Sequence, residues 1–269
     1  MVSDLSRLFI IICVIMRCDP ALMAKAPLRG AAKSRLVPPL TPEGAAELSR
    51  CFIRDVCAAI EDAIAMIPAA SKVRVSAMIA YTPARTEAAF DGLVPASFEF
   101  IEQRGEGLGE RLINVADDLL SAGFESVAMM NSDSPTIPPA ILGEAIARLA
   151  RPRDRLAIVG ADDGGYCLIG LKRPHWRIFE DITWSTSAVF AQTMERAAEL
   201  NLEVARMRSW YDIDDAASLR RLVGELFNDR TRGEETGPRS TAKNSAAPAT
   251  RAWLEAALAK GLANRLRTG

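Results

Sequence analysis

The sequence predicts an α/β fold in which helices cover both faces of a mostly parallel sheet. Apolar runs of strand length alternate with helix-length segments, in which apolar residues recur at helical spacing, over most of the chain. Alternation of this kind is typical of a mostly parallel sheet. A length of 269 residues suits one large α/β domain, or one domain with a tail.

The first predicted helix covers residues 42–66, because Thr41 is a good N-cap and Pro42 suits the first helical position. The other elements follow in chain order. They are strands at 73–81 and 98–101, a helix at 108–120, a strand at 126–130, a helix at 139–150, strands at 156–159 and 166–171, a helix at 187–200, a strand at 202–207 and a helix at 216–227.

Composition divides the chain into four parts. Residues 1–19 form an N-terminal extension, and residues 20–228 carry the alternating pattern of the α/β domain. Residues 229–249 are rich in Arg, Glu, Gly, Ser, Thr and Pro, which predicts a flexible linker. Residues 250–269 then predict an amphipathic helix that begins after Thr250 as N-cap and runs to about Leu266.

Charge and residue usage exclude several classes of function. The net charge of -1 offers no basic field for nucleic acid or an anionic membrane. The apolar run at residues 8–16 is too short to cross a bilayer, so we expect a cytoplasmic protein without a membrane span. Five scattered cysteines predict reduced thiols rather than zinc ligands or disulfides. The one histidine, His175, lies in a predicted turn, which argues against histidine-based catalysis.

The segment KAPLRGAAKSRL, residues 25–36, is a candidate phosphate-binding loop. It lacks the glycine spacing of a P-loop and the dinucleotide fingerprint. Its proline and glycine would shape the backbone, while its basic side chains would grip a diphosphate or triphosphate. Charge alone favours a solvated basic loop instead. The residues concerned are Lys25, Pro27, Arg29, Gly30, Lys33 and Arg35.

Two groups of aspartates are candidate ligands for Mg²⁺ or Mn²⁺. Asp133 follows a buried strand, where it would either hold a hard cation beside phosphates or only end the strand. Asp212 and Asp214 alternate, which places both on one face of an extended segment. Asp214 or Asp215 could instead cap the next helix, but a cap does not explain Asp212.

Two glycine-containing loops are candidate substrate contacts. The loop Asp162, Asp163, Gly164, Gly165 and Tyr166 is either a hairpin turn or a place where an Asp orients or deprotonates an acceptor hydroxyl. The segment 103–111 opens a helix, where its N–H groups would receive an anion or its glycines would only make a turn. Ligands gather at the carboxyl ends of parallel strands, so these loops and aspartates are expected to form one site.

Five motifs in order resemble one known family. They are K-A-P-x-x-G-x-x-K-[ST]-R-L, Q-R-G-x-G-[LF]-G-E-R, [ST]-D-S-P-T-[IL]-P, D-G-G-Y-x-L-I-G-L and W-Y-D-[IV]-D. Over residues 20–227 the chain resembles the bacterial GT-A-like glycosyltransferases of formerly unknown function, some of which are labelled as arsenosugar-biosynthesis enzymes. Nucleotidyltransferases, including the phospholactate guanylyltransferases, are neighbouring relatives.

The resemblance implies a Rossmann-like GT-A fold and a role for each matching residue. Lys25, Lys33, Arg35 and Arg111 would contact nucleotide phosphates. Asp133, Asp212 and Asp214 would lie at the metal, although Asn131 replaces the first carboxylate of the D-x-D-type motif.

The implied activity is a metal-dependent glycosyl transfer from a nucleotide sugar to a small-molecule acceptor, with Asp163 or Asp214 as base if the reaction inverts. A nucleotidyltransferase that joins an NTP to a phosphorylated small molecule is the second reading. A catalytically silent nucleotide-binding protein is the third.

Overall fold

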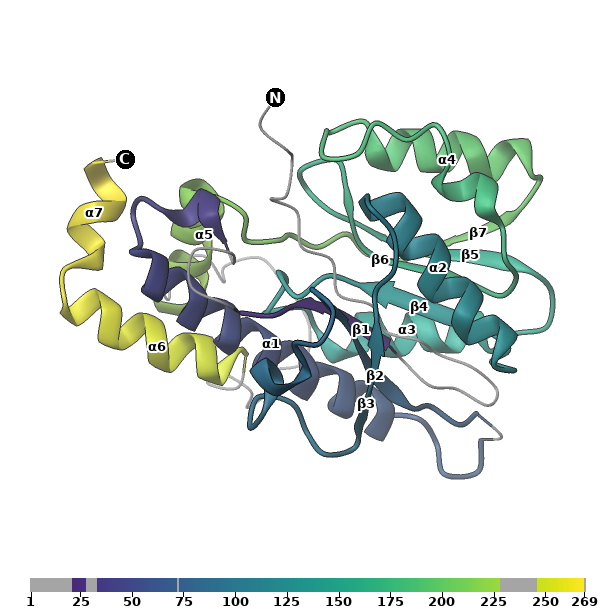
Figure 1. The fold of residues 1–269 in the computed structure, drawn as a ribbon, viewed down its shortest axis with the longest axis horizontal. Coiled ribbons are helices and arrows are strands. Elements are labelled where there is room, and N and C mark those ends of the chain that lie inside the picture. The colour runs from purple at the N-terminus through teal and green to yellow at the C-terminus, as the bar shows by residue number, and fades with distance from the viewer. Residues whose placement is uncertain (1–20, 28–32, 72, 228–245, 269) are drawn as a thin grey trace, which may run out of the picture.

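The computed structural model describes residues 21–27, 33–71, 73–227 and 246–268 (Figure 1). The predicted N-terminal extension, most of the predicted linker, and Arg29 and Gly30 lie outside the described residues. Within them, the alternating α/β pattern predicted from the sequence is confirmed.

The strands form two hydrogen-bonded sheets that lie edge to edge. The first has the order β1-β2-β3 and is parallel, with β1 at Ala21–Lys25, β2 at Ala77–Thr82 and β3 at Phe98–Glu102. The second has the order β4-β6-β5-β7, with β4 at Val127–Met130, β5 at Arg155–Gly160, β6 at Tyr166–Leu171 and β7 at Glu203–Arg206. Because β1 lies beside β4, the two sheets form one layer (Figure 1).

Strand β6 departs from the predicted parallel arrangement. It runs antiparallel to both of its neighbours, β4 and β5. The loop between β5 and β6 contains only residues 161–165, too few for the crossover that a parallel pair needs. The Asp-Gly-Gly loop is therefore a hairpin connection, which is the first of the two predictions made for it from the sequence.

Helices cover both faces of the layer, as predicted. The helices α1 (Pro42–Ala65) and α3 (Pro139–Leu149) pack on one face, and α2 (Leu108–Ser121) and α4 (Val189–Glu199) pack on the other. Along β4, alternate residues face the two cores: Ala128 and Met130 face α1 and α3, whereas Val127 and Met129 face α2. This two-sided burial explains why β4 is a continuous apolar run.

Short elements and a predicted cap complete the domain. Three 3₁₀ helices, η1 (Ser34–Leu36), η2 (Glu87–Phe90) and η3 (Trp176–Phe179), lie in the connections. Thr41 caps α1 as predicted, because its hydroxyl accepts a hydrogen bond from the Gly44 N–H at 3.1 Å.

The described residues of the C-terminal part form the helices α5 (Ala216–Phe227), α6 (Pro248–Ala259) and α7 (Leu262–Thr268). The single predicted C-terminal helix is wrong, because the chain turns at Gly261, whose φ is +86°. Thr250 is also not the N-cap, since α6 begins at Pro248. Asp55 of α1 accepts the N–H groups of Ala249 and Thr250 at 2.9 and 2.8 Å, so α6 is capped from another helix.

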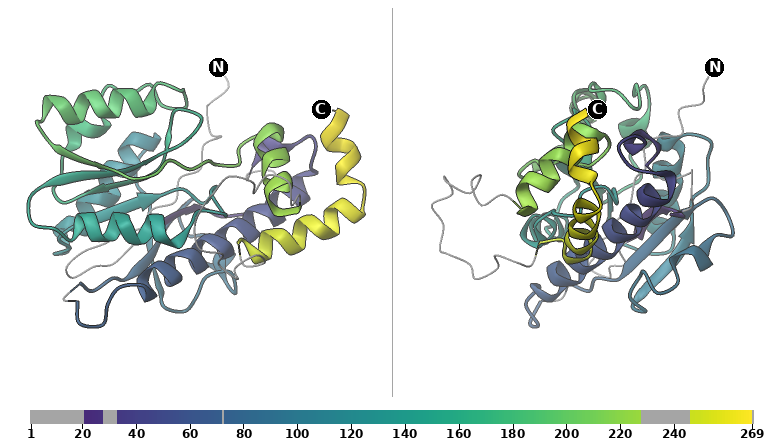
Figure 2. Two further views of the ribbon diagram at one scale, coloured as in Figure 1. Left: turned by 180° about the vertical axis from the view of Figure 1, so that it is seen from behind. Right: turned by 90° about the vertical axis from the view of Figure 1, so that its left-hand side faces the viewer.

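These helices close a third core cluster at one end of the domain. Figure 2 shows α6 running along α1, with α5 and α7 beside η1. Leu262 and Leu266 of α7 are buried together with Leu36, Leu40 and side chains of α5. The C-terminal segment therefore packs against the part of the domain that carries Lys33.

Two further expectations concern the cysteines and membrane spans. Cys51, Cys57 and Cys167 are buried free thiols, as predicted for reduced cysteines, and Cys13 and Cys18 lie outside the described residues. Among the helices in the described part of the chain, none has the length and apolar character that crossing a membrane requires.

Candidate active site

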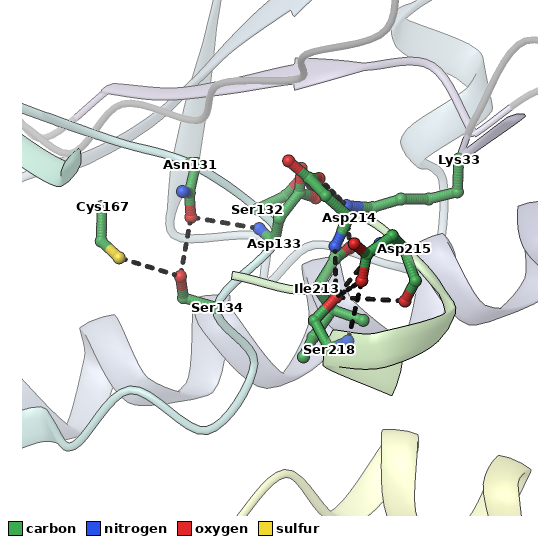
Figure 3. Close-up of polar contacts among 10 residues, drawn as sticks. All are labelled: Lys33, Asn131, Ser132, Asp133, Ser134, Cys167, Ile213, Asp214, Asp215 and Ser218. Carbon is green, nitrogen blue, oxygen red and sulfur yellow. Dashed lines mark hydrogen bonds and ion pairs between the residues drawn. The ribbon is translucent and has the colours of Figure 1, made fainter. Parts of the chain in front are cut away.

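The site forms where the segments that follow β4, β5 and β7 meet. Figure 3 shows residues 131–134 and 213–215 of this site beside Lys33. After β7 the chain continues beside the β5–β6 hairpin, because Asp162 N–H donates to Trp210 O at 3.1 Å. It then reaches the loop after β4, where Ile213 N–H donates to Asp133 O at 2.8 Å. These backbone bonds bring together residues 131–134, 162–165 and 210–214.

Lys33 joins the site from the opposite side, at the start of η1. Its Nζ lies 2.7 Å from Asp133 Oδ2 and 3.1 Å from Asp214 Oδ1, and donates to Ile213 O at 2.6 Å. The Lys33 side chain is only 3% exposed. Its backbone is left-handed, with φ at +51°, a costly conformation for a residue other than glycine. The predicted phosphate-binding lysine therefore lies among carboxylates.

The loop after β4 holds Asp133 in place through side-chain hydrogen bonds. The buried amide oxygen of Asn131 accepts from Asp133 N–H at 3.2 Å and from Ser134 Oγ at 3.0 Å. Ser132 Oγ donates to Asp133 Oδ1 at 2.8 Å. Both carboxylate oxygens of Asp133 thus have partners. Asn131 stands at the position that corresponds to the first carboxylate of the D-x-D-type motif. Its side-chain oxygen, the atom that would bind a metal, is instead used for the hydrogen bonds that hold this loop.

At the start of α5, neighbouring aspartates have different roles. Asp215 Oδ1 accepts from Ser218 N–H at 2.8 Å, and Ser218 Oγ accepts from Asp214 N–H at 3.0 Å. Asp215 and Ser218 therefore cap α5. The Asp214 carboxylate contacts Lys33, and the predicted capping role falls to Asp215.

Three carboxylates lie close enough to share one cation. Oxygen atoms of Asp163, Asp212 and Asp214 all lie within 4.8 Å of one another. Carboxylate oxygens are the preferred ligands of Mg²⁺ and Mn²⁺. The predicted metal set was Asp133, Asp212 and Asp214, whereas the structure groups Asp163 with Asp212 and Asp214. Asp133 instead pairs with Lys33.

Burial and charge shift the pKa values of this group. Burial raises the pKa of Asp212 to about 7, with further increases from Asp214 and Asp163. Burial also raises the pKa of Asp133 to about 6, although Lys33 opposes the shift. Burial alone would lower the pKa of Lys33, but Asp133 and Asp214 raise it above its ordinary value. Lys33 is therefore an ammonium ion at neutral pH, and the surrounding field is negative.

The hairpin loop depends on one glycine. Gly164 has φ at +88°, and a Cβ atom there would lie 2.2 Å from Ser187 O. Next to it, Asp163 Oδ1 accepts from Gly165 N–H at 2.8 Å, which orients the Asp163 carboxylate. Asp162 forms an ion pair with Arg221 at 2.5 Å, on the outside of the loop.

Tyr166 does not fit its predicted place in the acceptor-binding loop. Its side chain belongs to the core between the sheet, α2 and α4, and the residue is 2% exposed. Its ring packs edge-to-face against Trp184 at 6.5 Å. Position 166 is the first residue of β6, where the pleat points its side chain inward.

The other predicted phosphate contacts are placed as follows. Lys25 ends β1, and nothing is described of its side chain. Pro27 is buried, and Arg35 is exposed on η1. Arg111 Nε donates to Gly105 O at 3.0 Å, within the turn that opens α2. Among the contacts of the described residues, none joins Arg35 or Arg111 to the carboxylates.

Some residues of the site were not predicted from the sequence. Ser132 and Ser218 orient two of the aspartates, and Ile213 supplies a carbonyl oxygen to Lys33. The spacing of Asp215 and Ser218 is a capping signal that the sequence contains. His175, which the sequence analysis does not place in the site, lies with Nε2 2.7 Å from Asp154 Oδ2, near the start of β5.

The fold is of the GT-A-like, nucleotide-diphosphosugar transferase type. A crystal structure from Desulfovibrio desulfuricans G20, described as a candidate nucleotide-diphospho-sugar transferase, matches with a TM-score of 0.70 and 27% identity, covering 91% of this chain and 94% of that chain. A model of the family described as "Uncharacterized protein conserved in bacteria (DUF2064)" matches residues 66–186. Together these matches confirm the resemblance that the five motifs predict.

A second solved structure, a CMP:2-keto-3-deoxy-manno-octonic acid synthetase complexed with CTP, matches with a TM-score of 0.41 and 14% identity. It covers 64% of this chain and 85% of that chain. A comparison with curated proteins finds no significant match to the chain.

Proposed function

We propose that the protein is a glycosyltransferase that uses a nucleotide-sugar donor and a divalent cation, Mg²⁺ or Mn²⁺. The observation that carries the proposal is the contact of Lys33 with Asp133 and Asp214, beside the group of carboxylates that Asp214 forms with Asp163 and Asp212. An ammonium ion suits phosphate oxygens, and a carboxylate group suits a hard cation that phosphates share. The likeness to a candidate nucleotide-diphospho-sugar transferase supports this class of donor.

In this proposal Asp163, Asp212 and Asp214 hold the cation, and their grouping fits its preference for oxygen ligands. The cation would supply charge neutralisation for the leaving diphosphate. Lys33 donates hydrogen bonds to the phosphates, and the Asp133 loop keeps the ammonium in place. If the reaction inverts, the base for the acceptor hydroxyl would be Asp163 or Asp214, and the carboxylate that acts as the base would not also hold the cation.

The reaction class can be tested by identifying the leaving group. Purified protein is incubated with Mn²⁺, a panel of nucleotide sugars and NTPs, and candidate acceptors, while nucleoside diphosphate and pyrophosphate are measured separately. Acceptor-dependent release of nucleoside diphosphate supports glycosyl transfer. Release of pyrophosphate instead would identify a nucleotidyltransferase, and nucleotide binding without either product would indicate a silent binding protein.

A further inference from the structure

The ammonium group of Lys33 adjoins the candidate cation site, because it contacts Asp214, one of the three carboxylates in that group. It contacts Asp133, Asp214 and the Ile213 carbonyl at 2.6–3.1 Å. The Phe52 ring lies 5.7 Å from Nζ, so that an aromatic ring borders the ammonium as well. With the side chain 3% exposed, solvent screens this charge weakly.

Asp214 is shared between two positive charges. It is a partner of Lys33, and it also belongs with Asp163 and Asp212 to the group of oxygens that would hold a cation. A cation bound there would lie next to the Lys33 ammonium. Like charges on either side of one carboxylate repel, and the burial of Lys33 strengthens the repulsion because water screens it weakly. Phosphate oxygens would relieve this repulsion, because they attract both the cation and the ammonium.

We propose that Lys33 keeps the affinity of this carboxylate group for a bare divalent cation low, so that the site takes the cation together with nucleotide phosphates. The inference rests on the proposed function, since it concerns the same cation. Lys33 then has a different partner in each state. Without a ligand it neutralises Asp133 and Asp214, and when the metal–nucleotide complex binds it keeps Asp133 and transfers the hydrogen bond from Asp214 to the phosphates.

A purely structural Lys33 would behave differently. If the lysine only tied η1 to the start of α5, its removal would loosen Asp214 and weaken cation binding. If it opposes the cation, its removal strengthens cation binding. The sign of the change therefore separates the two roles.

The test compares the affinity of wild-type protein and of Lys33→Met for Mn²⁺. Electron paramagnetic resonance measures the concentration of free Mn²⁺ during each titration. We expect Lys33→Met to bind Mn²⁺ alone about tenfold more tightly than wild type, equivalent to about 1.4 kcal/mol. Nucleoside diphosphates (ADP, GDP, UDP and CDP, each tested) should tighten Mn²⁺ binding in wild type more than in the variant. Lys172→Met is the matched control, because Lys172 Nζ donates to the carbonyls of Leu149 and Arg151 at 2.8 and 2.7 Å, away from the aspartates.

Equal or weaker Mn²⁺ binding by Lys33→Met would overturn the inference while leaving the cation site of the proposed function intact. Failure of every protein to bind Mn²⁺, with or without nucleotide, would instead contradict the cation site itself.

A second measurement uses only wild-type protein, in case Lys33→Met does not fold. Acetylation of Lys33 by an N-hydroxysuccinimide ester, followed by mass spectrometry, should become faster when Mn²⁺ is added, because the cation displaces the ammonium from Asp214. Lys172 should show no change. An unchanged rate at Lys33 at saturating Mn²⁺ would contradict the inference.

Discussion

Lys33 Nζ lies 2.7 Å from Asp133 Oδ2, and the two side chains are 3% and 2% exposed. Lys33 follows β1 and Asp133 follows β4, two strands that lie side by side in the layer. This ion pair therefore joins the predicted phosphate-binding loop to the carboxylates at the end of the neighbouring strand.

Asp133→Asn should destabilise the protein, because it leaves the buried Lys33 ammonium with Asp214 as its one carboxylate partner among the described contacts. We expect a loss of about 3 kcal/mol in the free energy of unfolding, together with loss of cation-dependent nucleotide binding. Chemical denaturation measures the first effect and calorimetry the second. Asp118→Asn is the control, since its pair with Arg104 is exposed and should contribute less than about 1 kcal/mol. Equal stabilities of the two variants would contradict this account.

Gly164→Ala should distort the hairpin that carries Asp163. The backbone is left-handed there, and the new methyl group would lie 2.2 Å from Ser187 O. We expect a loss of stability of about 2 kcal/mol or more, measured by thermal unfolding. Gly143→Ala is the control, because nothing beyond its chain neighbours and the backbone of its own helix lies within 4 Å of its Cβ position in α3, and alanine is the better helix former. A Gly164→Ala protein as stable as wild type would show that the loop adapts.

Asp55, which caps α6 from α1, should make stability depend on pH. Burial raises its pKa above the ordinary value, although the hydrogen bonds from α6 oppose the shift. A carboxyl whose pKa is raised on folding binds its proton more tightly in the folded state, so its contribution favours folding at low pH. That contribution is lost as the pH rises from the ordinary pKa through the raised one.

Asp55→Asn removes this titration. Thermal unfolding at a series of pH values should show that wild type loses stability relative to Asp55→Asn as the pH rises above the ordinary aspartate pKa of about 4. The prediction fails if the difference between the two proteins is the same at every pH.

Leu266→Ala should loosen the third core cluster, which holds both η1 and α5. Leu266 is 5% exposed and packs with Leu36 and Leu40, and its carbonyl accepts a hydrogen bond from Arg220 at 2.9 Å. We expect a loss of about 2–4 kcal/mol in the free energy of unfolding, and weaker cation binding because Lys33 and Asp214 lie on the segments that move. Lys260→Ala, at an exposed position after α6, should change the stability by less than about 0.5 kcal/mol. The structural role of α7 is contradicted if both variants are equally stable.

Sequence reasoning predicted the helices and strands well where apolar periodicity is strong. The predicted spans of β6 and α5 match the structure, and α2, α3 and α4 differ by one or two residues at their ends. The direction of β6 was not predictable from periodicity, because a buried strand has the same pattern in a parallel or antiparallel sheet. The break at Gly261 was missed because helical spacing continues on both sides of it.

The site was predictable in its residue types but not in its pairings. Aspartates after apolar strands predicted a cluster of carboxylates, but the structure groups Asp163 rather than Asp133 with Asp212 and Asp214. Asp133 pairs with Lys33 because β1 and β4 are neighbours in the layer. The order of the strands along the chain does not reveal that these two strands lie side by side. The role of Asn131 in shaping the loop could not be predicted either, because it depends on the direction of its side-chain amide in the folded protein.

The measurement that tests the central claim most directly is nucleoside diphosphate binding by calorimetry, with Mn²⁺ or with a chelator, in wild type and Asp212→Asn. Asp118→Asn again serves as the control. The account predicts that wild type and the control bind tightly only with Mn²⁺, and that Asp212→Asn binds at least about tenfold more weakly, a loss of about 1.4 kcal/mol. Binding that is equally tight with the chelator, or unchanged in Asp212→Asn, would contradict a cation site built from these carboxylates.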